Sequence, residues 1–360
     1  MFPASIVSYR KTARFGGFLT AGLLTLAVLC PSTRAAGQAA SDWPTRRPAQ
    51  IRPQASSGPL LAAATAGAGA GSRIVAVGEH GVILLSDDGS TYRQARSVPT
   101  RAMLTTVCFI DRNTGWAAGH DGVVLKTTDG GENWQLLRQQ YGQEQPILSI
   151  WFGDASNGIA VGLFGMALST SDGGASWSEL KLASGDAADR HLYRILATPG
   201  GALLVMAEAG TVFRSEDGGK HWDVIDSGAK GSLWSALAFS DNGQSSVVAV
   251  GMRGHIVRSN DDGKSWQAVA SGTTQSLTDV ALLSGRELVA GGVGGALLFS
   301  SDGGRHFTAR QGAGDAPLTA LLKTPGPGPA QLALFSMAGV MKPLAAGTLL
   351  QPQPQPQPQP

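Results

Sequence analysis

Hydrophobic residues occur along the chain in short runs, in which apolar side chains alternate with small or polar ones. Two examples are "ILSIWF", residues 147–152, and "GIAVG", residues 158–162, and glycine-containing turn sequences separate such runs. Alternation with a period of two and enrichment in β-branched residues are typical of β-strands. Because the 360 residues include 49 glycines and show no helical periodicity beyond the first 40 residues, the pattern predicts an all-β protein with many tight turns.

The strand-like runs are arranged in a repeat that is marked by one turn sequence. "KTTDGGENW", residues 126–134, recurs as "STSDGGASW", "RSEDGGKHW", "RSNDDGKSW" and "FSSDGGRHF", with a shortened copy, "LSDDGSTY", upstream. We call these six segments the Asp motifs. Their aligned acids are separated by 41, 43, 45, 44 and 41 residues and are Asp88, Asp129, Asp172, Asp217, Asp261 and Asp302. This spacing is typical of one four-stranded propeller blade per repeat.

A seventh, divergent repeat follows the last Asp motif. "LALFSMAGVMK", residues 332–342, resembles "IVAVGEHGVILL" of the first repeat, with Gly339 in the place of Gly81, but it lacks the Asp, the Trp and a fourth strand. "DWPTRRPAQI", residues 42–51, begins with Trp43 as the other fourth strands begin with Trp. We therefore expect residues 41–350 to form a single seven-bladed β-propeller of four-stranded antiparallel blades. The N-terminal strand is expected to complete blade seven and close the ring, which leaves no free sheet edge.

The first 35 residues have the features of a secretory signal peptide. Basic Arg10, Lys11 and Arg14 precede an apolar run over residues 15–30, and small residues at 35–40 offer cleavage sites. The apolar run is shorter than the roughly 20 residues that a membrane-spanning helix needs. The mature protein is therefore expected to be exported, to the periplasm or beyond the cell.

Both ends of the chain carry further expectations. Cys30 lies where a lipid-anchored protein has its modified cysteine, but Leu29 is larger than the small residue preferred there, which favours plain cleavage. Cys108 is then the single cysteine, so an internal disulfide is excluded, and its apolar surroundings "LTTVCFI" favour a buried, inert thiol. Residues 351–360, "QPQPQPQPQP", are expected to form an extended, disordered tail.

Removal of the signal changes the charge of the protein. Residues 1–35 contain four basic residues and no acid, so the formal net charge falls from +2 to −2. A nucleic-acid partner loses its electrostatic support, because phosphate binding needs a surplus of Lys and Arg.

The Asp motifs fit the pattern Ser/Thr-x-Asp-x-Gly-x-x-Trp, which resembles the Asp box of bacterial neuraminidase repeats. The Asp is expected to accept hydrogen bonds from the backbone N–H groups that follow it, Gly to take a positive φ, and the Ser or Thr hydroxyl to tie the strand end. The aromatic residue is expected to cover the seam between blades; it is Trp134, Trp177, Trp222 or Trp266 in four copies.

Two chemical interpretations of the Asp motifs are less favoured. Each motif offers one or two carboxylates, whereas a calcium site assembles roughly 6–8 oxygens, and an enzyme does not need six copies of one acid. The motifs therefore predict a structural role, with no metal and no cofactor.

Function is expected at the other end of the ring. In an up-and-down blade the Asp motifs share one end, the motif end, with the loops between strands one and two. The opposite end, the crossing end, carries the turns between strands two and three and the crossings between blades. Its sequences vary, and variable loops on a uniform scaffold are where recognition usually lies. The candidate partner-binding residues are Arg101, His120, Asp121, Tyr141, Arg190 and Arg253.

Two interpretations of the charged residues at the crossing end stay open. Arg101, Arg138, Arg190 and Arg253 either gather as an acid-binding patch or are scattered solubilising charges. His80 and His120 come from neighbouring blades, but they lack an evident third metal ligand, which favours solvated turn residues.

"NTGWAAGHDGVVLKTTDGGENW", residues 113–134, resembles the repeat of the photosystem II stability/assembly factor family, and the likeness extends over residues 42–350. Members of that family are seven-bladed exported propellers. The resemblance implies a non-enzymatic scaffold that binds a protein partner and assists assembly or stability of a membrane complex. We expect the mature chain to be monomeric and soluble or membrane-peripheral. Blades one and seven depart from the pattern, so their contacts are not carried over.

The alternative is an Asp-box glycoside hydrolase of the sialidase type. Such an enzyme needs an arginine cluster, a tyrosine nucleophile and a glutamate partner. Tyr193, beside Arg194, is the one tyrosine on an inner strand, and the N-terminal arginine motif of neuraminidases is not apparent. Other hydrolases of this type use paired acids, whereas Asp279 stands alone on the inner strands. The missing constellation favours a protein that is not an enzyme.

Overall fold

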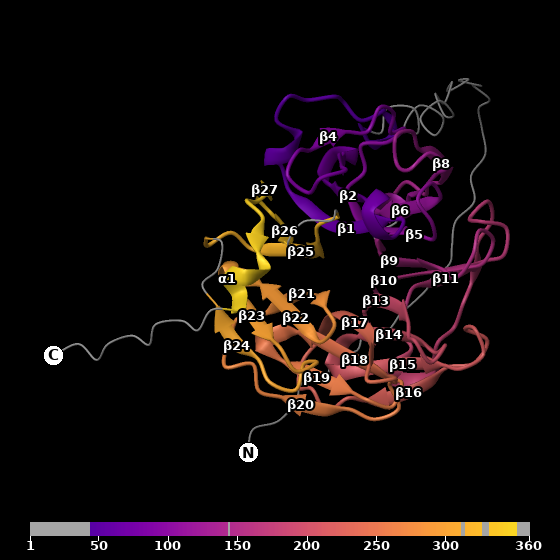
Figure 1. The fold of residues 1–360 in the computed structure, drawn as a ribbon. Helices are drawn as coiled ribbons and strands as arrows, with labels where there is room; N and C mark the ends of the chain where they lie inside the picture. The colour runs from indigo at the N-terminus through magenta and orange to yellow at the C-terminus, as the bar shows by residue number, and fades with distance from the viewer. Residues whose placement is uncertain (1–43, 143–144, 311–313, 326–330, 351–360) are drawn as a thin grey trace, which may run out of the picture. The chain divides into compact units, whose positions relative to one another are not determined.

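The computed structural model describes residues 44–142, 145–310, 314–325 and 331–350, and nearly all regular structure in them is β. The described residues form 28 strands in seven antiparallel sheets of four strands (Figure 1). The predicted signal segment with Cys30, and the Gln-Pro tail at 351–360, lie outside the described residues. Within them no helix is long and apolar enough to cross a membrane.

Each blade comprises four strands that are consecutive in the chain. The strands are β1 (Leu60–Ala66), β2 (Arg73–Gly78), β3 (Ile83–Ser86) and β4 (Arg93–Gln94) in blade one; β5 (Leu104–Phe109), β6 (Gly115–Gly119), β7 (Val124–Thr127) and β8 (Gln135–Arg138) in blade two; β9 (Ile147–Phe152), β10 (Gly158–Gly162), β11 (Ala167–Thr170) and β12 (Ser178–Glu179) in blade three; β13 (Leu192–Ala197), β14 (Leu203–Ala207), β15 (Thr211–Ser215) and β16 (Asp223–Asp226) in blade four.

The remaining strands are β17 (Leu233–Asp241), β18 (Gln244–Gly251), β19 (Ile256–Ser259) and β20 (Gln267–Val269) in blade five; β21 (Leu277–Ser284), β22 (Glu287–Gly292), β23 (Leu297–Ser300) and β24 (Thr308–Arg310) in blade six; β25 (Leu318–Lys323), β26 (Gln331–Ser336), β27 (Gly339–Val340) and β28 (Leu344–Ala345) in blade seven. Single 3-10 turns are η1 (Pro44–Arg46), η2 (Ala55–Ser57), η3 (Gly69–Gly71), η4 (Glu79–Gly81), η5 (His120–Gly122), η6 (Gly185–Ala187), η7 (Glu208–Gly210), η8 (Met252–Gly254) and η9 (Val293–Gly295). One short α-helix, α1 (Ala346–Leu350), follows β28, and the sequence pattern did not predict it.

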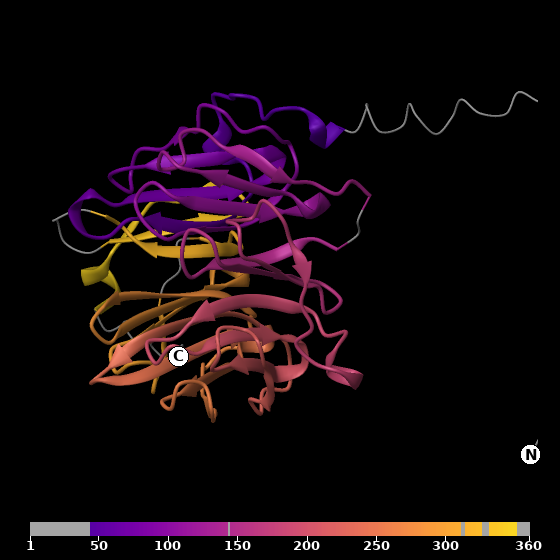
Figure 2. The same ribbon diagram turned by 90° about the vertical axis from the view of Figure 1, so that its right-hand side faces the viewer.

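The seven blades close into a ring. The first strand of each blade contacts the first strand of the next, in the order β1, β5, β9, β13, β17, β21 and β25, and β25 contacts β1 again. These strands surround the centre in Figure 1, and Figure 2 shows the same blades from the side. The predicted seven-bladed propeller is thereby confirmed.

Blade seven is completed in a different way from the one predicted. Its outer part consists of β27 and β28, two short segments that both pair with β26, through Phe335 with Val340 and Leu332 with Leu344. The prediction that residues 42–51 supply its fourth strand is therefore wrong for the residues described; Asp42 and Trp43 lie outside them.

The N-terminal segment, residues 44–50, instead lies on blades one and two. The Ala49 N–H donates to the Val98 carbonyl at 2.9 Å, and the Thr45 hydroxyl donates to the Asp121 carboxylate at 2.7 Å. Pro44 and Pro48 have no N–H to donate to a sheet, which explains why this segment forms a turn and side-chain contacts rather than a strand. Farther along, Ala55 of η2 packs in the same apolar cluster as Phe335 and Val340 of blade seven.

The core consists of apolar clusters at the seams between blades. Each of the seven clusters in the described residues combines side chains of two neighbouring blades. The aromatic residue of an Asp motif takes part in six of them, as Tyr92, Trp134, Trp177, Trp222, Trp266 or Phe307. At the seam between blades six and seven, where the seventh repeat has no motif, Met341 and Leu344 pack instead.

Each Asp motif is a closed hydrogen-bonded turn. In the five full copies the Asp carboxylate accepts the N–H of the fourth residue after it at 2.9–3.0 Å. The Ser or Thr two residues before the Asp donates to the carboxylate at 2.7–2.9 Å and accepts a glycine N–H at 2.9–3.0 Å. The four Trp Nε1–H groups donate to a carbonyl of the same turn at 2.9–3.1 Å. The turn thus fixes the Trp that packs into the seam.

The seam role of Trp134 predicts a large loss of stability on truncation. Its side chain is 5% exposed and packs among residues of blades one and two. Trp134→Ala should lower the free energy of unfolding by about 3–5 kcal/mol, as buried aromatic truncations do, when measured by urea denaturation. Leu136→Ala, two residues later on exposed β8, should change it by less than about 1 kcal/mol. Equal effects of the two substitutions would contradict the assigned role of Trp134.

The motif carboxylates predict acid sensitivity. Hydrogen bonds from the Ser176 hydroxyl and N–H, and from Thr170, lower the pKa of Asp172 to about 2. Because this pKa lies below the unfolded value of about 3.9, the contribution of Asp172 is present at neutral pH and is lost as the pH falls from about 4 to 2. The thermal midpoint of Asp172→Asn should fall less over this range than that of the wild type. Parallel midpoint curves for the two proteins would refute the assignment.

Candidate functional site

Backbone hydrogen bonds define what lies at each end of the ring. The turn of an Asp motif bonds to the loop between strands one and two, as in Gly130 N–H to Asn113 O at 2.9 Å. The turn between strands two and three bonds to the start of the innermost strand, as in His120 N–H to Met103 O at 2.9 Å. The motif end and the crossing end predicted from the sequence are therefore separate surfaces.

The turns at the crossing end present their side chains from a constrained backbone. Their second residue has φ of +55° or +56° in five blades, although it is not glycine: it is His80, Asp121, Phe164, Ala209 or Arg253. Such left-handed residues are uncommon outside glycine. The next residue is a glycine packed so closely on the crossing that a Cβ on Gly165 would collide with the Ala188 carbonyl oxygen. Each turn is thus anchored and displays one side chain in a fixed direction.

The structure brings three of the six candidate residues together, but beneath the N-terminal segment. The Arg101 Nε–H donates to the Pro48 carbonyl at 2.9 Å, and Asp121 accepts from Thr45. The guanidinium of Arg46 lies 4.4 Å from the centre of the Tyr141 ring. Residues 44–48 therefore occupy part of the surface that the sequence assigned to a partner. This contact differs from the predicted place of the segment in blade seven, and no sequence pattern indicates it.

The other three candidate residues are spread over blades two, four and five. His120 and Arg253 are exposed at the tips of η5 and η8. Arg190, in the crossing from blade three to blade four, donates to the Glu208 carbonyl at 3.5 Å. These residues share the crossing end of the ring without contacting one another.

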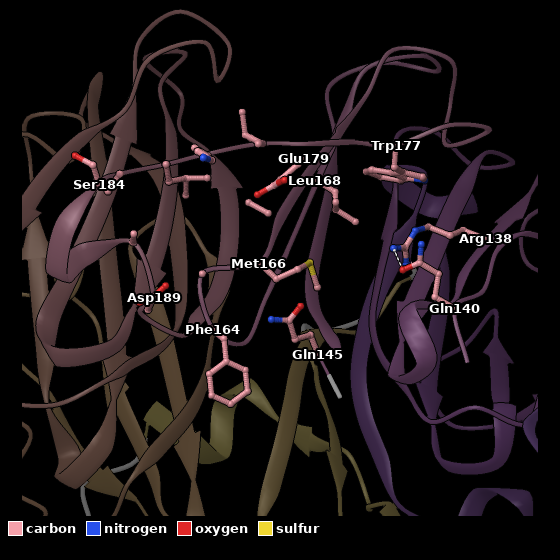
Figure 3. Close-up of a pocket in the computed structure, with 17 residues that line it drawn as sticks. Arg138, Gln140, Gln145, Phe164, Met166, Leu168, Trp177, Glu179, Ser184 and Asp189 are labelled. Atoms are coloured by element: carbon pink, nitrogen blue, oxygen red, sulfur yellow. Dashed lines mark hydrogen bonds between the residues drawn. The ribbon is translucent and has the colours of Figure 1, made fainter. Parts of the chain in front are cut away.

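A cleft of about 660 Å³ lies beside the outer strands of blade three (Figure 3). Arg138, Gln140 and Trp177 line one side, and Ser184 and Asp189 of the next crossing line the other. Met166, Leu168 and Glu179 lie between the two sides, and Phe164 lies below them in the view.

The sequence indicated the loops that line this cleft, but it did not indicate the cleft itself. β12 pairs with β11 through two residues, and Met166 and Leu168 of this region are partly exposed to the cleft. Phe164 at its margin is 54% exposed. A cleft with apolar and polar walls and an exposed aromatic side chain fits an extended polypeptide segment.

Charge is distributed unequally between the two ends. Every ion pair between described residues lies at the motif end, such as the pairs that join Asp241, 1% exposed, to Arg258 at 2.8 Å and to Arg286 at 2.9 Å. At the crossing end the guanidinium groups of Arg101, Arg138 and Arg190 donate to backbone carbonyls. A carbonyl oxygen carries no net charge, so these hydrogen-bond partners do not compensate the positive charge of the three side chains.

The groups that an enzyme would use are apart. Tyr193, the candidate nucleophile, has its hydroxyl 3.5 Å from the Ser232 hydroxyl and lines the central channel. Cys108 is partly buried on β5, and burial raises the pKa of its thiol to about 12, so the reactive thiolate is scarce. Within the described ranges no three His, Cys, Asp or Glu side chains are close enough to hold a metal ion.

Comparison with known proteins identifies the repeat. The sequence model of the family described as "Photosynthesis system II assembly factor YCF48" matches residues 86–256. No curated protein sequence matches the chain. A solved structure titled "YCF48 bound to D1 peptide" has a TM-score of 0.62 and 19% identity, over 83% of this chain and 96% of its own. "YCF48 from Cyanidioschyzon merolae" also has a TM-score of 0.62, with 16% identity over 84% of this chain and 99% of its own. The repeats of residues 86–256 are therefore similar to those of the photosystem II assembly factor YCF48 family, in a chain that folds as a seven-bladed propeller.

Proposed function

We propose that this protein is a non-catalytic scaffold that binds a protein partner and assists assembly or stability of a membrane complex. The observation that carries the proposal is the match of residues 86–256 to the YCF48 assembly-factor family, together with the shared seven-bladed fold. One protein with this fold has been solved with a bound D1 peptide, so a ring of this kind is able to hold a polypeptide segment.

The partner is proposed to bind at the crossing end, over the blade-three cleft and the arginines beside it. Phe164 supplies an exposed aromatic anchor, and aromatic residues contribute strongly to protein interfaces. Arg101, Arg190 and Arg253 supply charge that no carboxylate of the described residues neutralises. A polypeptide with apolar and acidic side chains fits this combination. His120, Asp121 and Tyr141 are assigned to the same face at its edge, beside the N-terminal segment.

The setting of this function follows from the N-terminal sequence. We propose that the signal-like residues 1–35 direct the protein out of the cytoplasm and that the mature chain works as a monomer, soluble or peripheral to the membrane. A partner embedded in or attached to that membrane would then be within reach of the crossing end.

Charge removal at the crossing end should weaken partner binding. Simultaneous Arg101→Gln, Arg190→Gln and Arg253→Gln changes should reduce recovery of the partner from detergent-solubilised membranes at least about tenfold, about 1.4 kcal/mol, in a quantitative pull-down. The matched control carries Arg112→Gln, Lys220→Gln and Lys264→Gln, which remove the same charge at the motif end and should leave recovery unchanged. Unchanged recovery with the first set, or an equal loss with the control set, would refute the proposed face.

Catalysis can be tested directly on the purified protein. A fluorogenic sialoside should be hydrolysed no faster by the wild type than by buffer, because Tyr193 has no glutamate partner among the described contacts. Turnover that is above background in the wild type and is lost in Tyr193→Phe would instead establish the glycoside hydrolase.

A further inference from the structure

The innermost strands share a bulge that the blade repeat reproduces seven times. In every blade the pairing of the innermost strand with its neighbour shifts at the second residue of the strand. A bulged residue is left out of the ladder and turns its side chain away from the sheet. The bulged residues are Leu61, Thr105, Leu148, Tyr193, Trp234, Thr278 and Thr319, and all seven line the central channel.

The channel encloses about 350 Å³, a volume suited to a small ligand or the end of a chain. Because the innermost strands start at the crossing end, the bulged residues surround the mouth of the channel at that end. Leu61, Leu148, Tyr193 and Trp234 make much of this mouth apolar and aromatic.

In three blades the side chain of the residue after the bulge accepts a backbone hydrogen bond from the next blade. Thr106 and Ser149 accept the N–H groups of Ile150 and Ile195 in the next blade, at 3.3 and 3.2 Å. In blade six Asp279 accepts the N–H of Leu321 at 2.8 Å. These bonds join neighbouring innermost strands, and each requires a side chain with an acceptor atom.

The same position is Arg194 in blade four. It is the one basic residue among the seven, which are Ala62, Thr106, Ser149, Arg194, Ser235, Asp279 and Ala320. A guanidinium has five donors and no acceptor, so it cannot make the bond that Thr106, Ser149 and Asp279 make. Its Nε is buried without a hydrogen-bond partner among the residues that the structure describes. Leaving a buried donor unpaired costs stability, and a small polar residue would fit the repeat better. A large cation that costs stability and stands where the other blades have a small or acidic residue is a candidate for function.

The charge around Arg194 favours a ligand with a single negative charge. Among the described residues, Asp279 is the one acid that lines the channel. Burial raises its pKa, while the charge of Arg194 acts against this rise. The carboxylate of Asp279 is also held by Ser235, whose hydroxyl donates at 2.7 Å, and no ion pair with Arg194 forms. The lining cations are Arg194 and Lys323, and Lys323 is exposed at the opposite end.

We propose that the central channel binds a monocarboxylate with an apolar or aromatic body, and that the Arg194 guanidinium donates hydrogen bonds to the carboxylate. The planar fork of a guanidinium matches a carboxylate with two parallel hydrogen bonds. Tyr193, Trp234 and Leu148 would then contact the apolar body at the channel mouth. The carboxylate belongs either to a free small acid or to the C-terminus of a polypeptide. This site uses the innermost strands rather than the outer loops, and its mouth opens at the same crossing end as the proposed partner face.

Binding is measured by titration calorimetry and by quenching of tryptophan fluorescence. The probes are benzoate, hexanoate and the peptide acetyl-Ala-Ala-Leu with a free C-terminus, and each is paired with its neutral amide. At least one acid should bind in a 1:1 complex, and its amide should bind at least about tenfold more weakly. Binding of benzoate or hexanoate indicates a free acid as the source, and binding of the peptide alone indicates a chain terminus. Failure of all three acids to bind, or equal binding of acid and amide, overturns the proposal without any variant.

The variants separate ligand binding from folding. Arg194→Ser should lose acid binding at least about tenfold. Its melting temperature should equal or exceed that of the wild type, because serine removes the unpaired buried donor and supplies the acceptor that Ser149 supplies in blade three. Arg194→Lys should bind with intermediate strength. Arg112→Ser, which removes an exposed arginine at the motif end and outside the channel, should bind the acid like the wild type. Undiminished binding by Arg194→Ser overturns the proposal, and so does a loss that Arg112→Ser shares.

Discussion

The structure depends on one local interaction: a carboxylate that accepts the backbone N–H of the fourth residue after it. This bond closes the turn between the third and fourth strands in five blades, and a shorter version around Asp88 does so in blade one. The closed turn holds the indole N–H of the following Trp and sets its ring into the seam with the preceding blade. Since each seam is an apolar cluster shared by two blades, the same turn that ends a hairpin also joins the ring.

The two ends of the ring differ in their ionic contacts as a consequence of this arrangement. At the motif end, acids and arginines neutralise each other across the seams, and Asp241 with its arginines is the most buried example. The crossing end carries no such network in the described part of the chain, and its arginines donate to carbonyl oxygens. A rigid ring therefore presents charge, an exposed Phe164 and a cleft on the face that does not hold it together.

Much of the fold could be predicted from the sequence, because the repeat length and the spacing of the Asp residues report one blade at a time. The place of the N-terminal segment could not be predicted, since a single Trp before Pro44 resembles the start of a fourth strand, whereas the prolines prevent pairing. The outer part of blade seven could not be predicted either. It comprises two segments of two residues each, which are too short to show an alternating pattern.

The site was predicted less completely than the fold. The variable loops favour the crossing end for recognition, which stays a prediction, and they gave no sign of the cleft beside β11 and β12. The channel depends on bulges that only the ladder register shows. Arg194 was visible in the sequence as a neighbour of Tyr193; its departure from the repeat became apparent only when the seven innermost strands were aligned by structure.

Hydroxyl-radical footprinting of the purified complex between this protein and its membrane partner tests the separation of the two ends most directly. Phe164 and Met337, 54% and 43% exposed at the crossing end, can be compared with His221 and His306, whose side chains are 90% and 86% exposed at the motif end. Oxidation of Phe164 and Met337 should fall in the complex, while oxidation of both histidines should remain as in the free protein. Protection of His221 and His306, with Phe164 oxidised as before, would contradict the assignment of structure to one end and recognition to the other.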